Sequence, residues 1–247
     1  QEFSNPHEII KEWKRLIKFA KKNFKIICTP FDERSVDKIY EHNFDYIKIA
    51  SCSMDEWPLL EYIAKKPKKK IICSLGGADE AKIIRTVSFF SSKKINTKFL
   101  YCVAKYPTNP ENLNLSFFEY LRTIYKDKIL GFSTHESPDE NLTGGLAYAM
   151  GARIFEKHIG LSTSKYSLNK YSVSPEKIQV WLENLKNSII IYGSVNKRLS
   201  FLREENKNLA VFKRGAFLKK GLNKKIGDGV TLKDVNFYYP ANKNQIL

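Results

Sequence analysis

The 247-residue sequence has no long apolar run and does not open with a signal peptide. No stretch approaches the roughly 18 apolar residues that a membrane-spanning helix needs. The first residues also lack the basic and then apolar order of a secretory leader. We therefore expect a cytoplasmic protein that has no membrane partner.

Cysteine is scarce, with four residues in the chain: Cys28, Cys52, Cys73 and Cys102. Their spacing is not that of a zinc knuckle, and each lies within or just after an apolar run. This pattern predicts reduced cysteines in a hydrophobic core, as is usual in the cytosol.

Acidic residues are few beside basic ones, 26 against 42, and the formal net charge is +16. Such a balance raises the possibility of nucleic-acid binding, which would weaken steeply with salt. The lysines, however, are scattered along the chain, and their densest run, 65–70, precedes an apolar segment where a solvated turn is expected. We therefore expect no nucleic-acid partner, and a basic surface that attracts anionic substrates.

Hydrophobic residues make up 43% of the chain and aromatic residues 13%, which is enough for a sizeable core. Short apolar runs alternate with segments of helical periodicity, an order that is typical of a parallel α/β fold. The expected strands are 25–29, 45–50, 70–74, 98–103, 128–135 and 153–158, and the expected helices are 5–22, 35–41, 56–64, 76–90, 116–125, 141–150 and 175–192.

Three regions follow from this pattern. A complete eight-stranded barrel usually takes about 250 residues, more than residues 1–192 supply, so we expect a partial (β/α) barrel there. A polar, basic linker is expected over 193–208. Residues 209–247 have glycines between short β-like runs and predict a small, mainly β module.

Two of the expected strands end in a histidine, His135 and His158, and the segment between them predicts a helix. A strand-helix-strand unit places both imidazoles at the carboxyl ends of neighbouring parallel strands, where α/β proteins build their sites. Two adjacent imidazoles can hold a divalent metal. The alternative is that each histidine is an ordinary, hydrogen-bonded polar group at a strand end.

The chain resembles the sialic acid synthase family, which condenses phosphoenolpyruvate with an N-acetylated aldose to give nine-carbon 2-keto acids used in cell-surface glycans. The resemblance rests on segments 29–32 (TPFD), 46–51 (YIKIAS), 58–60 (PLL), 106–107 (YP), 131–133 (GFS) with His135, 151–152 (GA) and 156–158 (EKH), in one order and at family-like spacing. It implies a TIM-type barrel that lacks its first two strand-helix units. It also implies that residues 209–247 are an antifreeze-like (SAF, β-clip) domain that stops short of its usual end.

Phosphoenolpyruvate is an anion, so its site needs fixed positive charge and hydrogen-bond donors. Lys48 is our candidate for that charge, because it lies inside an apolar run where an unpaired ammonium group would be costly. Hydroxyl residues stand at or just beyond the ends of the expected strands and predict a phosphate site. These hydroxyl residues are Thr29, Ser51, Ser74 and Ser133.

The resemblance further implies that His135 and His158 hold Mn²⁺ or Mg²⁺, which would polarise the aldehyde of the sugar. Tyr106 would contact the sugar. Arg214, in the last module, would grip the substrate carboxylate in the site of a second copy, which implies a homodimer with exchanged C-terminal domains. Glu156 and Lys157 match the family motif, but the sequence gives neither residue a role.

The sequence departs from the family pattern in four places. Thr134 and Ser53 stand where the family has an aspartate and a glutamate. The loop 165–172 replaces a glycine-proline-aspartate loop, and Asn169 is our candidate for the aspartate's place. The first two barrel units are missing. The acceptor sugar is therefore not fixed, and the alternative to a synthase is a fragmentary or non-catalytic relative that keeps the phosphoenolpyruvate and metal pocket.

Overall fold

The structure, a computed structural model, describes residues 6–210 and 212–239, and side chains from residue 11 onward. The chain divides into two compact units between Ile191 and Tyr192. Each unit is described by itself below.

The first unit is built on one parallel sheet of six strands in sequence order. The strands are β1 (Ile27–Cys28), β2 (Tyr46–Ile49), β3 (Lys70–Ser74), β4 (Thr97–Cys102), β5 (Ile129–Thr134) and β6 (Ile154–Lys157). Each pairs in parallel with the next, as expected for strands joined by helical crossovers. The predicted order of strands and helices is confirmed.

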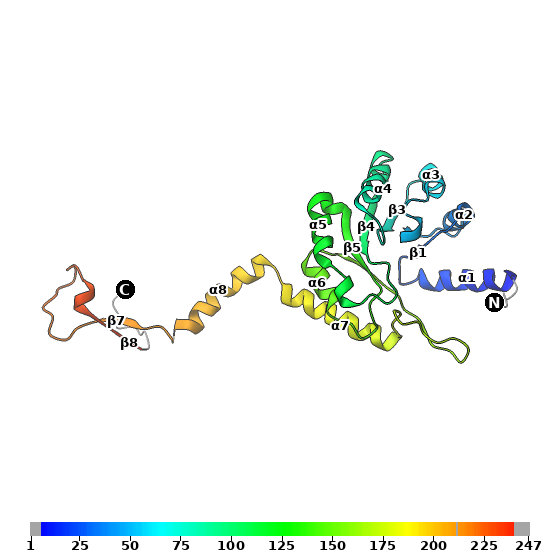
Figure 1. The fold of residues 1–247 in the computed structure, drawn as a ribbon. Helices are drawn as coiled ribbons and strands as arrows, with labels where there is room; N and C mark the ends of the chain where they lie inside the picture. Colours follow the sequence, from blue (N-terminus) through cyan, green and yellow to red (C-terminus); the bar gives the residue numbers. More distant parts are fainter. Residues whose placement is uncertain (1–5, 211, 240–247) are drawn as a thin grey trace. The chain divides into compact units, whose positions relative to one another are not determined.

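One helix precedes the first strand, one connects each strand with the next, and one follows the last strand (Figure 1). They are α1 (Pro6–Ala20), α2 (Glu33–Glu41), α3 (Trp57–Lys65), α4 (Glu80–Ser92), α5 (Leu115–Tyr125), α6 (Thr143–Ala149) and α7 (Pro175–Tyr192). Short 3₁₀ turns lie at η1 (Ser51–Ser53), η2 (Pro110–Asn112) and η3 (Lys126–Lys128). Asp32 and Asp79 begin α2 and α4 by accepting hydrogen bonds from the backbone three residues on, which satisfies free N–H groups of the first turn.

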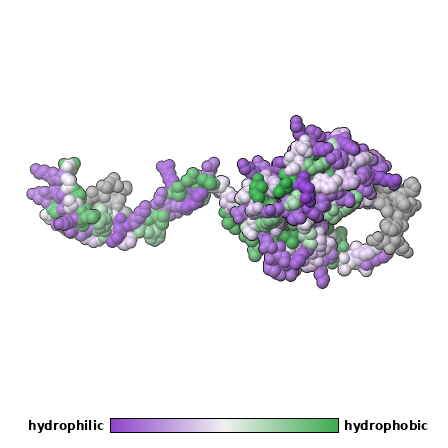
Figure 2. Space-filling model, turned by 45° about the horizontal axis from the view of Figure 1, so that its top comes forward, coloured by the Kyte–Doolittle hydropathy of each residue, from purple (hydrophilic) through white to green (hydrophobic). Residues whose placement is uncertain are grey.

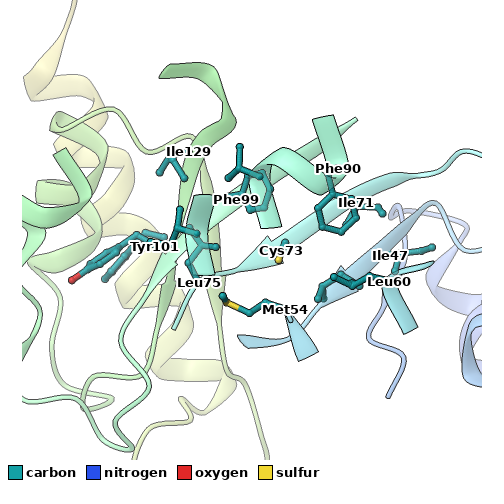
Figure 3. Packing of buried hydrophobic residues seen from close by; sticks show 14 of the residues in the cluster. Ile47, Met54, Leu60, Ile71, Cys73, Leu75, Phe90, Phe99, Tyr101 and Ile129 are labelled. Carbon is teal, nitrogen blue, oxygen red and sulfur yellow. The ribbon is translucent and has the colours of Figure 1, made fainter. Parts of the chain in front are cut away.

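The core lies between the sheet and these helices, as Figure 3 shows for residues from β2 to β5. Alternate side chains of each strand point into it, such as Ile47 and Ile49 of β2. They meet buried residues of the helices, among them Phe90 of α4, whose ring lies 6.2 Å from that of Phe99 on β4. The other face of each strand is therefore free to carry polar groups.

The sheet curls strongly, and one ion pair demonstrates the curl. Lys48 on β2 and Glu156 on β6 are four strands apart in the sheet order, which is about 19 Å in a flat sheet. Their Nζ and Oε2 atoms are 3.3 Å apart. The first unit is therefore a curled half-barrel whose concave face carries this ion pair, in agreement with the expected partial barrel.

Strand β1 forms one edge of the half-barrel. It has only two residues, and the side chain of Ile27 is 44% exposed. Helix α1 lies beside this edge, where Trp13 and Ile17 help to line a cavity of about 340 Å³. The apolar edge is the exposed core flank that an incomplete barrel predicts.

The second unit contains α8 (Val195–Ala210), an antiparallel pair of strands, β7 (Gly215–Leu218) and β8 (Val235–Tyr238), and the 3₁₀ turn η4 (Leu232–Asp234). The two strands lie within residues 209–247, where the antifreeze-like module stays a prediction, and the segment 193–208, predicted as a linker, is largely helical. The lysine, arginine, glutamate and leucine residues of that segment favour a helix, and its polarity alone does not reveal this. Residues 240–247 of the expected module lie outside the described residues.

None of the helices in the described ranges is long and apolar enough to cross a membrane. Hydrophilic side chains cover most of the visible face in Figure 2, with small hydrophobic patches among them. The four cysteines are free, and Cys73 and Cys102 are buried as predicted. Cys52 is exposed, contrary to expectation, because it lies in the turn η1 just beyond the end of β2.

Candidate active site

Lys48 is the central cation of the concave face. The ammonium group donates hydrogen bonds to Ser74 Oγ at 2.8 Å and to the carbonyl of Ile49 at 3.2 Å, and the residue is 7% exposed. Register explains the first contact, since Lys48 pairs with Ile72 in the sheet and Ser74 is the next inward residue of β3. The predicted burial of Lys48 is confirmed, and its role in phosphate binding stays a prediction.

Glu156 matched the family motif in the sequence, but sequence reasoning gave it no role in this site. One of its carboxylate oxygens lies 3.3 Å from the Lys48 ammonium, and the other accepts a hydrogen bond of 3.4 Å from Ser133 Oγ. Ser133 is opposite Glu156 in the β5–β6 register. The family motif around Glu156 was visible in the sequence, but its contact with Lys48 depends on the curl of the sheet.

His135 and His158 lie side by side, as the strand-helix-strand pattern predicted. Their ring centroids are 5.0 Å apart. His135 is 5% exposed, and its Nδ1 lies 3.0 Å from the carbonyl oxygen of Val103. Because that oxygen can only accept, Nδ1 carries the proton in a neutral ring and Nε2 is left with its lone pair.

Burial lowers the pKa of both imidazoles below the usual value of 6.5. For His135 the next cause is the backbone contact with Val103, which acts in the opposite direction. Desolvation disfavours the charged ring, so both histidines are neutral at pH 7. Neutral imidazole is the form that binds metals.

Two tyrosines line the histidine pair. The Tyr106 ring centroid lies 4.4 Å from that of His135. Tyr171 stands almost perpendicular to His158 at 5.1 Å and lies 5.2 Å from Tyr106. Tyr106, a predicted sugar contact, is 55% exposed, as a residue at the mouth of a site would be. Tyr171 was not singled out in the sequence, because the loop that carries it has no strand or helix pattern.

Ser51, another predicted site residue, supports the loop after β3. Its Oγ accepts a hydrogen bond of 3.0 Å from the N–H of Gly76. A Cβ atom at Gly76 would come within 2.7 Å of Ser51 Oγ and 3.0 Å of Cys102 Sγ, so glycine permits this close approach. Cys102 in turn lies 3.8 Å from His135 Nδ1. Cys102 thus lies next to His135, and Ser51 supports the loop that packs against Cys102.

Three other predicted residues have no described contact with Lys48, Glu156 or the two histidines. Thr29 lines the cavity beside α1. Asn169 is exposed, and its Oδ1 accepts hydrogen bonds from the N–H groups of Tyr171 and Ser172. Arg214 belongs to the second unit, where its guanidinium group lies 5.8 Å from the centre of the Phe237 ring. The functional roles of all three stay predictions.

Two departures from the family pattern are buried. Thr134 is fully buried, and its hydroxyl donates to the carbonyl of Glu156 at 3.2 Å. Ser53 is 4% exposed, at the end of η1. An aspartate or a glutamate at such positions would bring a further buried negative charge, which these two hydroxyl residues avoid.

The cluster combines one buried cation, one carboxylate, several hydroxyl groups and two neutral imidazoles. The cation and the hydroxyls suit an anionic oxygen ligand, since charge-assisted hydrogen bonds are the strong ones. The Nε2 atoms suit a divalent metal, and the Val103 carbonyl is the kind of second partner that orients a metal-binding histidine. Among residues 11–210 and 212–239, no group of three or more His, Cys, Asp or Glu is placed to hold a metal. A metal here would take its remaining ligands from substrate and water.

The model of the NeuB family matches residues 2–197. The chain belongs to the NeuB family. This membership confirms the resemblance found in the sequence.

Curated relatives of this NeuB chain carry the names of synthases. It is 30% identical to the N,N'-diacetyllegionaminic acid synthase of Campylobacter jejuni over 225 residues, which is 87% of the chain and 64% of the relative. It is 29% identical to human N-acetylneuraminate-9-phosphate synthase, with 68% of the chain and 46% of that protein covered. The chain thus spans less than two thirds of the length of these relatives.

Solved protein structures share the fold of this chain. A Chromobacterium violaceum protein assigned to spore coat polysaccharide biosynthesis matches with a TM-score of 0.82 at 38% identity, covering 93% of this NeuB chain and 68% of that protein. The N-acetylneuraminic acid synthetase of Leptospira borgpetersenii matches with a TM-score of 0.68 at 28% identity, covering 81% and 70%. The six-stranded half-barrel therefore corresponds to part of a larger fold in these proteins.

Proposed function

We propose that the protein is a synthase of the sialic acid type. It condenses phosphoenolpyruvate with N-acetylmannosamine or a related N-acetylated amino sugar and water, and releases phosphate and a nine-carbon 2-keto sugar acid. The observation that carries the proposal is the convergence of Lys48, Glu156 and the two histidines on the concave face of a NeuB-family half-barrel. The product would serve in the biosynthesis of cell-surface glycans.

Lys48 and the neighbouring hydroxyls bind the phosphoenolpyruvate anion. The ammonium already has hydrogen-bond partners in Ser74 and the Ile49 carbonyl, so its position is fixed before the substrate arrives. A fixed cation in a buried site stabilises charge without reorganisation. Glu156 forms an ion pair with the ammonium and repels a misplaced anion, which favours a substrate position on the Ser74 side of Lys48.

The sugar binds at the open side of the histidine pair. The rings of Tyr106 and Tyr171 offer apolar faces to the C–H groups of a sugar or to its acetamido methyl, and their hydroxyls offer hydrogen bonds. Asn169 and the loop it shapes lie next to Tyr171 in the chain. His135 and His158 would hold Mn²⁺ or Mg²⁺, and a divalent ion there supplies Lewis acidity toward a carbonyl oxygen.

The bond changes balance without a further reactant. C3 of phosphoenolpyruvate forms a carbon-carbon bond to the sugar aldehyde, whose oxygen becomes a hydroxyl. Water then forms a bond to C2, and the bond between C2 and the phosphate oxygen breaks. Phosphate leaves, and the 2-keto acid remains. Lys48 stays close to the departing negative charge throughout.

A second candidate is a non-catalytic relative that binds phosphoenolpyruvate and metal. Thr134 and Ser53 favour it, because they replace two carboxylates of the family pattern while the cation and the histidine pair are kept. This candidate predicts binding of phosphoenolpyruvate without turnover.

Phosphate release decides between the two candidates. The assay contains phosphoenolpyruvate, Mn²⁺ and a panel of N-acetylated hexoses, and uses this chain and any longer form of the protein. Release that is lost in His135→Ala supports the synthase. Binding of phosphoenolpyruvate in calorimetry without release in any form of the protein supports the non-catalytic relative.

The proposal includes a homodimer with exchanged C-terminal units, in which Arg214 of one copy reaches the site of the other. The test mixes two inactive variants, His135→Ala and Arg214→Ala, refolds them together and measures the synthase activity of the mixture. Exchange of units creates some intact sites, so activity should return in the mixture. Activity that stays absent, although mass analysis shows mixed dimers, contradicts the exchange.

A further inference from the structure

A buried ion pair lies behind the two histidines, on the opposite face of the sheet. Glu136 follows His135, and Lys157 precedes His158, so both side chains point toward the helices. Lys157 Nζ is 3.4 Å from Glu136 Oε1, and the two side chains are 4% and 0% exposed. Phe155, on the same face of β6, packs against Trp181 of α7. The pair therefore lies outside the concave pocket.

This ion pair is expensive to bury. Neither Glu136 oxygen nor the Lys157 ammonium makes a hydrogen bond within the described residues. Taking two charges out of water costs several kcal/mol per ion, and apolar residues of similar size are often equally stabilising. The stability of the fold therefore does not explain why charged residues are present here. The position of the pair in the sheet suggests an explanation.

The pair joins β5 and β6 at the point where their backbone pairing ends. Thr134 and Lys157 are the last residues in register. Beyond them the two chains turn to different partners, since the His135 carbonyl accepts from Thr108 N–H at 2.8 Å and the His158 carbonyl accepts from Val173 N–H at 2.9 Å. Within the described residues, the Glu136–Lys157 pair is the side-chain ion pair that links these two diverging ends.

We propose that the Glu136–Lys157 ion pair is a positioning element, which sets the separation of His135 and His158 for a shared metal ion. The inference rests on the metal-binding part of the proposed function. The ion pair acts through the backbone: it holds residue 136 to residue 157, and the imidazoles project from the neighbouring residues to the other face. Neither Glu136 nor Lys157 contacts substrate.

The test separates positioning from stability with a double apolar variant, Glu136→Leu with Lys157→Met. This variant leaves no unpaired buried charge, so its melting temperature should equal or exceed that of the unchanged protein. Its Mn²⁺ affinity, measured from the electron paramagnetic resonance signal of free Mn²⁺, should fall about 10- to 100-fold, as when residues that orient metal ligands are lost. The single variant Lys157→Met should also lose stability.

A surface ion pair of the same region provides the control. Lys177 and Asp139 are 2.6 Å apart, and their side chains are 48% and 76% exposed. The double variant Lys177→Met with Asp139→Asn should keep both melting temperature and Mn²⁺ affinity. If the Glu136→Leu, Lys157→Met variant is folded and binds Mn²⁺ like the unchanged protein, the positioning role is refuted.

A second measurement applies if the unchanged protein binds no Mn²⁺, a result that would refute the metal-binding part of the proposed function. Crystal structures of the metal-free protein and of the double apolar variant then give the separation of the two rings directly. We expect the variant to depart from the 5.0 Å centroid distance or to show more than one ring position. An unchanged ring pair in the variant would refute the positioning role independently of any metal.

Discussion

Replacing Lys48 with methionine should abolish tight binding of phosphoenolpyruvate while the protein stays folded. Methionine keeps the length of the side chain in its apolar strand and removes the charge. The ammonium makes hydrogen bonds to Ser74 and Ile49 and an ion pair with Glu156. Removing it also frees the Glu156 carboxylate to repel the substrate anion, so two effects act in the same direction.

The magnitude follows from these contacts. A hydrogen bond from a charged group contributes about 1.5–3 kcal/mol, which corresponds to about 10- to 150-fold in affinity. We therefore expect phosphoenolpyruvate affinity in Lys48→Met to fall by about this factor. Stability should change little, since the Glu156 side chain is 37% exposed and keeps access to water, while burial of the ammonium is no longer required.

Calorimetric titration with phosphoenolpyruvate and thermal unfolding of the same samples test this prediction. Lys93→Met is the matched control, because it breaks a 3.0 Å ion pair with Glu61 between α4 and α3, away from the concave face. It should bind phosphoenolpyruvate normally. The reasoning is refuted if Lys48→Met unfolds at the usual temperature and still binds phosphoenolpyruvate as tightly as the control does.

Three further outcomes follow from the packing and the pocket. Gly131→Ala should destabilise the half-barrel by about 3 kcal/mol, since the added Cβ would stand 2.6 Å from the Ile154 carbonyl oxygen. Urea unfolding measures this loss, and an unchanged unfolding midpoint would contradict the described close approach. Burial raises the pKa of Tyr101, whose hydroxyl donates to the Leu113 carbonyl, to about 12. The unfolded chain then releases this proton near its usual pKa of 10 and the folded protein does not. Stability should therefore fall by up to about 3 kcal/mol between pH 10 and pH 12, and Tyr101→Phe should remove that part of the slope. Tyr171→Ala should raise the KM for the sugar about tenfold with little change for phosphoenolpyruvate, and equal changes for both substrates would argue against a sugar-side position.

The local pattern of the sequence was sufficient for the elements of the half-barrel. An apolar run between two turns predicted β3 with its observed ends, Lys70–Ser74. Helical spacing of apolar residues predicted α7 with its observed ends, Pro175–Tyr192. Strand β1 was expected over 25–29 and is limited to Ile27–Cys28. Among the described strands it pairs with β2 alone, so few of its residues have a partner to hold them in the sheet.

The site was predictable where a residue's own neighbours in the chain determine its surroundings. Lys48 was expected to be buried because Ile47 and Ile49 flank it, and it is. Glu156 and Tyr171 escaped because their partners come from elsewhere: Glu156 meets Lys48 across the curl, and Tyr171 reaches the histidines from a loop without periodicity. Burial can be read from sequence neighbours, whereas contacts across a curled sheet cannot.

Strand β6 shows how these distant contacts support the site. It is four residues long, and within the described residues it pairs with β5 alone, so its backbone hydrogen bonds hold it from one side. Two consecutive charged residues, one on each face of the strand, compensate for this one-sided backbone pairing. Glu156 reaches Lys48 across the concave face, and Lys157 reaches Glu136 on the helix-facing side. Ion pairs of this kind add little net stability but demand a specific geometry. They therefore fix the position of the strand that precedes His158. The relative position of the two histidine rings thus depends on charges that lie on both faces of an edge strand.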